Sequence, residues 1–115
     1  MEIKEMYSKE WLSINPDAKK IIWENPIFHK VIIENEIVAV RRLGKDKDGV
    51  LTSYNVYVLP KFRRKAKVII ENSISHYLSQ GRFKIFKPTK RIQELLEIKP
   101  KFKFEKSLDF WEVKL

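Results

Sequence analysis

The chain has 115 residues, which is enough for one hydrophobic core and too few for two. Its content of 43% apolar and 12% aromatic residues excludes a disordered chain, and no apolar run approaches the roughly 20 residues of a bilayer-spanning helix. The net charge of +9 favours anionic partners such as nucleic acid, a phosphorylated cofactor or an acidic protein.

The composition also limits which catalytic and metal sites the chain can form. The chain has no cysteine, which excludes disulfide bonds and thiolate catalysis. His29 and His76 lie far apart, so no metal site is predicted. The N-terminus lacks the basic-then-apolar layout of a signal peptide. We therefore expect a single cytoplasmic domain over residues 1–115 with no membrane partner, and the oligomeric state stays open.

Residues 1–24 predict a weak strand followed by one or two short helices. Charged side chains make residues 1–7 a poor strand. Ser8 is the expected N-cap of the first helix, and either Asn15 or Asp17 is expected to begin a second one.

The next part of the chain predicts two consecutive β-hairpins. Residues 29–43 are rich in β-branched side chains and are interrupted at Glu34 and Asn35. Because Asn tolerates a positive φ, a tight turn fits this interruption. The polar segment 44–49 has a glycine at each end and predicts a second turn, which leads into a strand over 50–59.

The rest of the chain is organised around the strand, basic turn and long helix of residues 54–80. Pro60 ends the strand because it has no N–H to donate. An apolar side chain then recurs every fourth residue, which predicts a helix ending near Gly81: Ala66, Ile70, Ile74 and Leu78. Five cations crowd the start of this helix: Lys61, Arg63, Arg64, Lys65 and Lys67. Cations are unfavourable there unless they are solvated or an anion joins them, so the cluster indicates either a phosphate site or a solvated basic turn.

The last third predicts a strand, a short helix and a final hairpin. Cations alternate with apolar residues over 82–87, as in a strand. Thr89 is the expected cap of an amphipathic helix that ends before Pro100. Residues 106–109 form the expected turn of the closing hairpin.

This order of elements resembles the GNAT N-acetyltransferase fold over nearly the whole chain. In that family a segment of the form P-x-x-R-x-x-G-x-G joins the fourth strand to the main helix. Pro60 and Arg63 match it in type and spacing, while Ala66 and Val68 stand at the two glycine positions. The resemblance predicts an α+β fold with a central, mostly antiparallel, twisted sheet of about six to seven strands and helices on both faces.

The resemblance also implies a cofactor and a reaction. The cofactor is acetyl-CoA or another acyl-CoA, whose pyrophosphate the loop holds, and the second substrate is an amine acceptor. The implied cofactor-binding residues are Val58, Leu59, Arg63, Arg64, Lys65, Ala66, Lys67 and Val68. The family often carries a proton-donating tyrosine in its fourth helix, and here that position falls near Leu96.

The acceptor amine has to lose a proton, and the chain offers few groups to take it. Glu36 beside the first hairpin and Tyr57 in the fourth strand are the predicted catalytic residues. Glu34, His76 and Tyr54 are alternatives. The sequence contains no Ser-His-Asp set and no Walker loop.

A second interpretation stays open. A GNAT-like scaffold without catalysis would bind nucleic acid or an acidic protein, for example as a viral or mobile-element protein that acts on a host partner. Residues 82–106 carry nine cations and three acids, interleaved with aromatic residues. Since alternation along a strand turns those aromatics toward the core, only the charge supports this alternative. Whether the chain is an enzyme is therefore open; if it is one, we expect an acyl-CoA N-acyltransferase.

Overall fold

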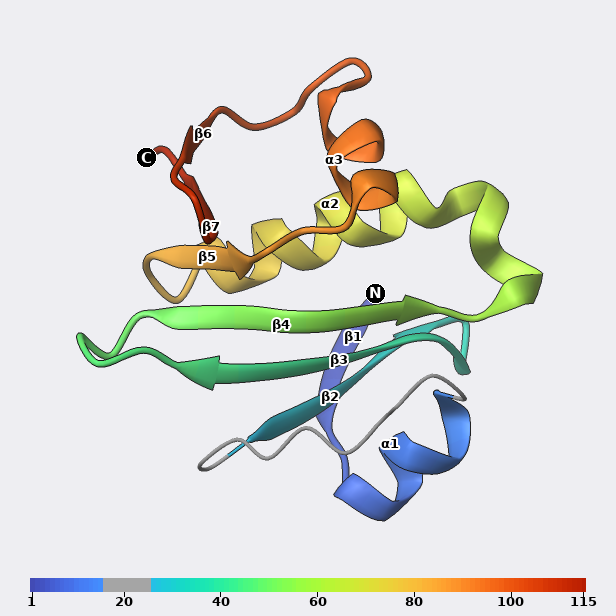
Figure 1. The fold of residues 1–115 in the computed structure, drawn as a ribbon. Coiled ribbons are helices and arrows are strands. Elements are labelled where there is room, and N and C mark those ends of the chain that lie inside the picture. Colours follow the sequence, from blue (N-terminus) through green and yellow to red (C-terminus); the bar gives the residue numbers. More distant parts are fainter. Residues whose placement is uncertain (16–25) are drawn as a thin grey trace.

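The computed structural model describes residues 1–15 and 26–115 (Figure 1). The strands are β1 (Glu2–Glu5), β2 (Ile27–Ile33), β3 (Glu36–Lys45), β4 (Leu51–Val58), β5 (Phe83–Phe86), β6 (Phe104–Lys106) and β7 (Phe110–Val113). The helices are α1 (Ser8–Ile14), the 3-10 helix η1 (Pro60–Lys65), α2 (Ala66–Leu78) and α3 (Lys90–Glu97). The second short helix predicted to begin at Asn15 or Asp17 falls mainly on residues 16–25, outside the described residues.

The seven strands form one sheet in the order β1-β2-β3-β4-β5-β7-β6. Every neighbouring pair is antiparallel except β4 and β5, which are parallel. A parallel pair needs a long crossover, and here η1 and α2 supply it. The predicted mostly antiparallel sheet is confirmed, with seven strands.

The first helix begins one residue earlier than predicted. Its N-cap is Tyr7, which makes no side-chain capping bond, so the prediction of Ser8 as the cap is wrong. The main chain closes the first turn instead, through the Trp11 N–H and the Tyr7 carbonyl at 3.1 Å. Trp11 is buried, with its ring centroid 5.2 Å from that of Phe28. Burial of this indole rather than capping therefore holds α1 on the sheet.

Both predicted hairpin turns are present. Glu34 and Asn35 have φ of 51° and 64°, which suits a two-residue turn between β2 and β3. In the next turn one carboxylate oxygen of Asp46 accepts hydrogen bonds from the N–H groups of Asp48 and Val50. Gly49 has φ of 78°, a conformation that most other residues avoid.

Adjacent arginines in β3 mark the two faces of the sheet. Arg41 donates a hydrogen bond to Ser73 of α2, whereas the Arg42 guanidinium lies 5.9 Å from the ring centroid of Trp11 in α1. Helices therefore cover both faces, as predicted. α3 lies on the α2 side, where Lys67 Nζ of α2 is 3.2 Å from the Leu95 carbonyl oxygen of α3.

The predicted apolar stripe of the long helix is confirmed. Ala66, Ile70 and Ile74 are buried in the core cluster, and Gly81 follows the helix with φ of 135°. In α3, Thr89 Oγ1 accepts a hydrogen bond from the Ile92 N–H at 3.2 Å, as the sequence predicts. In the part of the chain that the structure describes, no helix has both the length and the apolar character to cross a membrane.

The junction between β4 and β5 departs from a regular sheet in two ways. Tyr54 is the extra residue of a β-bulge opposite β3, and a bulge bends the strand that contains it. β4 pairs with β5 only over residues 51–53, with Ser53 opposite Ile85 as the last pair. Residues 55–58 of β4 consequently pair with no other described strand on the β5 side.

Candidate active site

A cavity of about 440 Å³ opens where β4 and β5 separate. Residues 53–58 of β4 line one side, and residues 85–89 with the first two turns of α3 line the other. Arg41 and Ile70 contribute to the lining from β3 and α2. The cavity therefore exists because the sheet splits here. Below, its closed end means the end at Ser53 and Ile85, where the two strands still pair.

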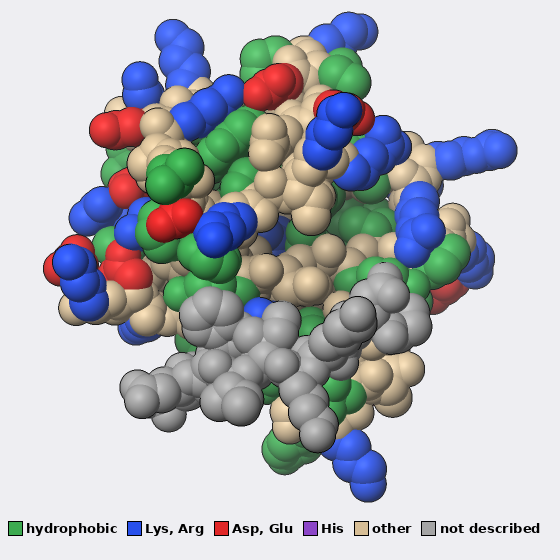
Figure 2. All heavy atoms as spheres, in the orientation of Figure 1, with side chains coloured by type: hydrophobic (Ala, Val, Ile, Leu, Met, Phe, Trp, Pro, Cys, Tyr) green, Lys and Arg blue, Asp and Glu red, His purple; other side chains and the backbone are tan. Residues whose placement is uncertain are grey.

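The lining is strongly basic. Four cations contribute to it, and none of the described lining residues is acidic: Arg41, Arg63, Lys87 and Arg91. Lys87 Nζ is 3.8 Å from a carboxylate oxygen of exposed Asp109, and the other three make no ion pair within the described residues. Figure 2 shows the hollow near the centre of this face, with Lys and Arg side chains gathered beside it over α3 and η1. Such a cavity attracts anions.

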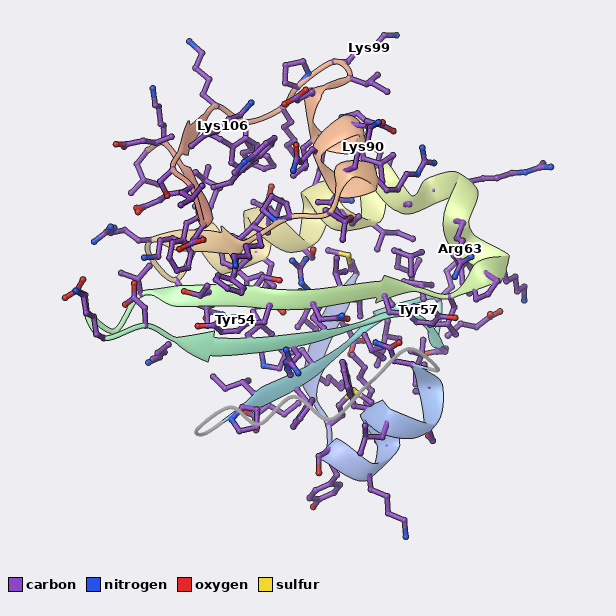
Figure 3. All side chains as sticks on the ribbon, viewed as in Figure 1. Tyr54, Tyr57, Arg63, Lys90, Lys99 and Lys106 are labelled. Atoms are coloured by element: carbon purple, nitrogen blue, oxygen red, sulfur yellow. The ribbon has the colours of Figure 1, made fainter. Side chains whose placement is uncertain are left out.

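The outer end of the cavity lies where β4 runs into η1. The Arg63 guanidinium is 5.5 Å from the ring centroid of Tyr57, and Arg63 Nε donates to the Val58 carbonyl at 3.3 Å. Figure 3 shows both side chains at this end of β4, with Tyr54 farther back along the strand. These contacts fix the position of the Arg63 side chain beside the opening.

The basic segment forms a 3-10 helix rather than an open loop. η1 continues directly into α2, and the Ala66 N–H donates to the Arg63 carbonyl. One main-chain donor at the start of α2 is therefore already used. Among the cations that line the cavity, Arg63 is the nearest in sequence to this helix start, and a guanidinium can supply charge-assisted hydrogen bonds to a phosphate.

The structure brings together only part of the predicted cofactor-binding set. Val58, Arg63 and Ala66 line the cavity. The remaining members lie outside the lining: Leu59, Arg64, Lys65, Lys67 and Val68. Lys67 Nζ binds Glu71 at 2.9 Å, because residues four apart in a helix share a face, and the Val68 side chain is 58% exposed. The binding roles of the whole set stay predictions.

The two predicted catalytic residues lie apart. Tyr57 lines the cavity, as does the alternative Tyr54. Glu36 lies at the start of β3, where its carboxylate is 3.3 Å from Lys61 Nζ on the exposed surface and outside the lining. The alternative Glu34 lies in the exposed hairpin turn, and His76 lies on the exposed side of α2. Their catalytic roles remain untested predictions.

Several lining residues were not predicted from the sequence. Arg41 and Ser53 lie at the closed end, and Lys87 and Arg91 arrive from the segment around α3. The pair of arginines inside the otherwise apolar run 37–43 was a signal for buried charge. Near the predicted position of the family's tyrosine, Leu96 is buried in the core.

Three aromatic residues of the basic C-terminal third turn toward the core, while Phe86 lines the cavity. Phe83 is buried, and Phe102 and Phe104 pack against the core. Lys90, Lys99 and Lys106 are exposed around them, as Figure 3 shows. Charge rather than stacking is therefore what this region offers to a polyanion.

A second polar cluster lies on the α2 side of the sheet. His29 Nδ1 and Tyr77 Oη are 2.8 Å apart. Burial lowers the pKa of His29, although Glu5 opposes the shift, and burial raises the pKa of the Tyr77 phenol. Both groups are thus neutral near pH 7. The described residues contain no group of three or more His, Asp or Glu side chains arranged to hold a metal ion.

Comparison with known proteins finds no matching family model and no matching curated protein. Solved structures do match. An acetyltransferase of Bacillus subtilis in complex with CoA is 14% identical, with a TM-score of 0.61 over 97% of this chain and 94% of that one. An IAA acetyltransferase from Bacillus cereus is 10% identical, with a TM-score of 0.58 over 97% and 96% of the two chains.

The ribosomal-protein-S18-alanine N-acetyltransferase from Escherichia coli is 13% identical, with a TM-score of 0.58 over 97% of this chain and 90% of that one. At these identities the matches concern the fold, and they extend over nearly all of each chain. The chain therefore has the fold of the GNAT acetyltransferases.

Proposed function

We propose that the chain binds an acyl-CoA in the cavity between β4 and β5 and transfers the acyl group to an amine acceptor. The observation that carries this proposal is the basic lining of that cavity, which holds four cations and no acid among the described residues. A chain of the same fold has been solved in complex with CoA. A CoA thioester is anionic, elongated and partly apolar, and these properties suit such a cavity.

The unpartnered part of β4 suits the middle of the ligand. The Val58 carbonyl is bound by Arg63, but over residues 55–57 the N–H and C=O groups on the β5 side pair with no described strand. The pantetheine arm of CoA carries two amides, which would pair with these groups as an added strand does. Ile92 and Leu95 of α3 supply an apolar wall opposite.

The orientation of the ligand in the cavity follows from the positions of the cationic side chains. Its phosphates would lie at the outer end beside Arg63, within reach of cations from the segment around α3 such as Lys87 and Arg91. The arm would then run back along β4 toward Tyr54 and Ser53, where the strands begin to pair. The thioester is thereby placed at the deeper end of the cavity.

The chemistry requires two proton movements. The amine nitrogen attacks the thioester carbonyl carbon, the carbon–sulfur bond breaks, and the CoA thiolate takes up a proton while the former amine loses one. We propose Tyr54 as the group that gives the proton to the thiolate, because it lies nearer the closed end than Tyr57 does. The proton lost from the amine passes to solvent or to a base.

Calorimetric titration with acetyl-CoA tests the binding step. We expect one-to-one binding that weakens as salt rises, because side chains rather than main-chain groups hold the phosphates. Arg63→Gln is expected to weaken binding about tenfold, the lower range for loss of a charge-assisted hydrogen bond.

Lys61→Gln is the matched control, because it removes the same charge from the same η1 helix but lies outside the cavity and faces Glu36. We expect it to leave the affinity within about twofold, the scale of a single exposed charge. Equal losses in the two variants would show that only overall charge matters, and absence of binding to the unmodified protein would refute the proposed function.

A further inference from the structure

The proposed phosphate site gives no role to one of the cations that line the cavity, Arg41. It lies in β3 with 1% of its surface exposed, and it contributes to the cavity lining beside Ser53. Ser53 and Ile85 form the last pair between β4 and β5. The main chain of Arg41 is opposite Val56, but its guanidinium reaches Ser53 and therefore lies at the closed end, away from the opening beside Arg63.

The hydrogen bonds of Arg41 go to neutral groups. One terminal nitrogen donates to Ser73 Oγ, and Nη2 donates to Ser53 Oγ at 3.0 Å. The guanidinium lies 5.4 Å and 5.7 Å from the ring centroids of Tyr77 and Phe83, while Nε has no hydrogen-bond partner in the described part of the chain. Two hydroxyls and two rings orient this charge without neutralising it.

No carboxylate among the described residues forms an ion pair with Arg41. The buried acid of α2, Glu71, is bound by Lys67. Burial lowers the pKa of Arg41, yet a guanidinium keeps its proton in proteins. Among the described residues this interior positive charge is thus uncompensated, and a buried charge without a counter-ion carries a large desolvation penalty.

A ligand anion at the closed end would offset that penalty. The proposed function places the acyl group of the thioester at this end, since its phosphates lie beside Arg63. Simple acetyl and longer alkanoyl groups carry no charge, and they would leave Arg41 as it is. An acyl group with its own carboxylate would give the buried guanidinium a counter-ion in a water-poor site, where a charge-assisted pair is strong.

We propose that the chain prefers acyl-CoA substrates whose acyl group ends in a carboxylate, and that Arg41 binds this carboxylate at the closed end of the cavity. This inference rests on the proposed function and names its substrate class. The serines hold the guanidinium in place, so Arg41 is the residue that selects the acyl group and Arg63 the one that selects CoA.

Two stable CoA thioethers test the preference directly. One ends in a propionate carboxylate, and the other ends in the corresponding amide, so that they differ only in charge. For the unmodified protein we expect the carboxylate probe to bind at least about tenfold tighter by calorimetry, a difference of about 1.4 kcal/mol. This comparison needs no variant.

Two substitutions then show which arginine is responsible for the preference between the probes. Arg41→Met keeps much of the volume and is expected to make the two affinities equal by weakening the carboxylate probe alone. If this variant does not fold, Arg41→Gln replaces it with the same expected result. Arg63→Gln is expected to weaken both probes by a similar factor, because it acts on the shared CoA part.

The possible outcomes separate the two proposals. Binding of both probes with equal affinity to the unmodified protein would overturn this inference and leave the proposed function standing. A preference that persists in the Arg41 variants would overturn the role of Arg41. Failure of CoA and both probes to bind would overturn the proposed function and this inference together.

Discussion

At the scale of single residues, the candidate site consists of charged and hydroxyl-bearing side chains that lie along the part of β4 beyond its pairing with β5. Tyr54 lies at its bulge, and Arg63 lies at its outer end, where it binds the Val58 carbonyl. The four residues of extended chain from Tyr54 to Val58 span roughly 13 Å. That separation assigns them different tasks. Arg63 contributes to binding, and Tyr54 lies where a reacting group would be.

Replacing Tyr54 by Phe tests this assignment. The change removes only the phenol oxygen, so the proton donor is lost while the ring keeps its place beside Phe86, whose centroid is 5.4 Å away. We expect kcat for acyl transfer to fall about 10²-fold with little change in KM, the lower range for loss of a general acid. Tyr57→Phe is the matched control and is expected to affect kcat less. The opposite order of the two effects would assign the role to Tyr57.

His29 gives the fold a dependence on pH. Burial lowers its pKa in the folded chain below the value of about 6.5 expected in the unfolded chain, although Glu5 opposes the shift. Between these two values the unfolded chain binds a proton that the folded chain does not. The free energy of unfolding therefore falls as pH decreases through this window, by up to about 1.4 kcal/mol per pH unit.

Urea unfolding at pH values between about 7 and 5 measures this dependence. His29→Gln keeps a polar group near Tyr77 and removes the titration, so we expect a shallower decline of stability in that variant. His76 is present in both proteins, so it cannot account for a difference between them. Identical pH dependence in the two proteins would show that His29 is not the responsible group.

At the scale of elements, α3 is the wall that closes the cavity opposite β4. It has only eight residues, from Lys90 to Glu97, and helices of this length are not stable alone. Leu96 is buried in the core with Ile92 and Leu95 packed against it, Thr89 caps the first turn, and Lys67 contacts the Leu95 carbonyl. The shape of the cavity therefore depends on the contacts that hold this short helix.

Removing the cap tests this dependence. Thr89→Ala is expected to lower the free energy of unfolding by about 1 kcal/mol, the usual loss for an N-cap hydroxyl. Amide hydrogen exchange should become faster in α3 than in α2. Thr89→Ser retains the hydroxyl and should restore both values to near those of the unmodified protein. Uniformly faster exchange throughout the chain would show that α3 does not open on its own.

The helices, strands and turns were easier to predict from the sequence than the residues of the candidate site. The four-residue apolar repeat of α2 and the turn at Asn35 are local patterns, and local geometry is enough to interpret them. Lys67 shows the limit of this reasoning. It belongs to the same basic cluster as Arg63, but its helical position turns it toward Glu71 and Leu95.

At the scale of the whole molecule, the sheet consists of two parts that meet at the short pairing between β4 and β5. Four strands, β1 to β4, lie on one side of this pairing, and β5, β7 and β6 lie on the other. The separation after Ser53 and Ile85 creates the cavity. No local pattern predicts where two strands cease to pair, so Arg41 and Arg91 could not be assigned to one site from the sequence.

The central claim is that an acyl-CoA occupies the cavity between β4 and β5. Titration of the isotope-labelled protein with acetyl-CoA, followed by amide NMR shifts, tests it most directly. The account predicts saturable shifts concentrated in residues 54–58, in 85–92 and in η1, with β1 and β2 unaffected. Shifts spread over exposed lysines such as Lys99 and Lys106, without saturation, would contradict it and indicate a general affinity for anions.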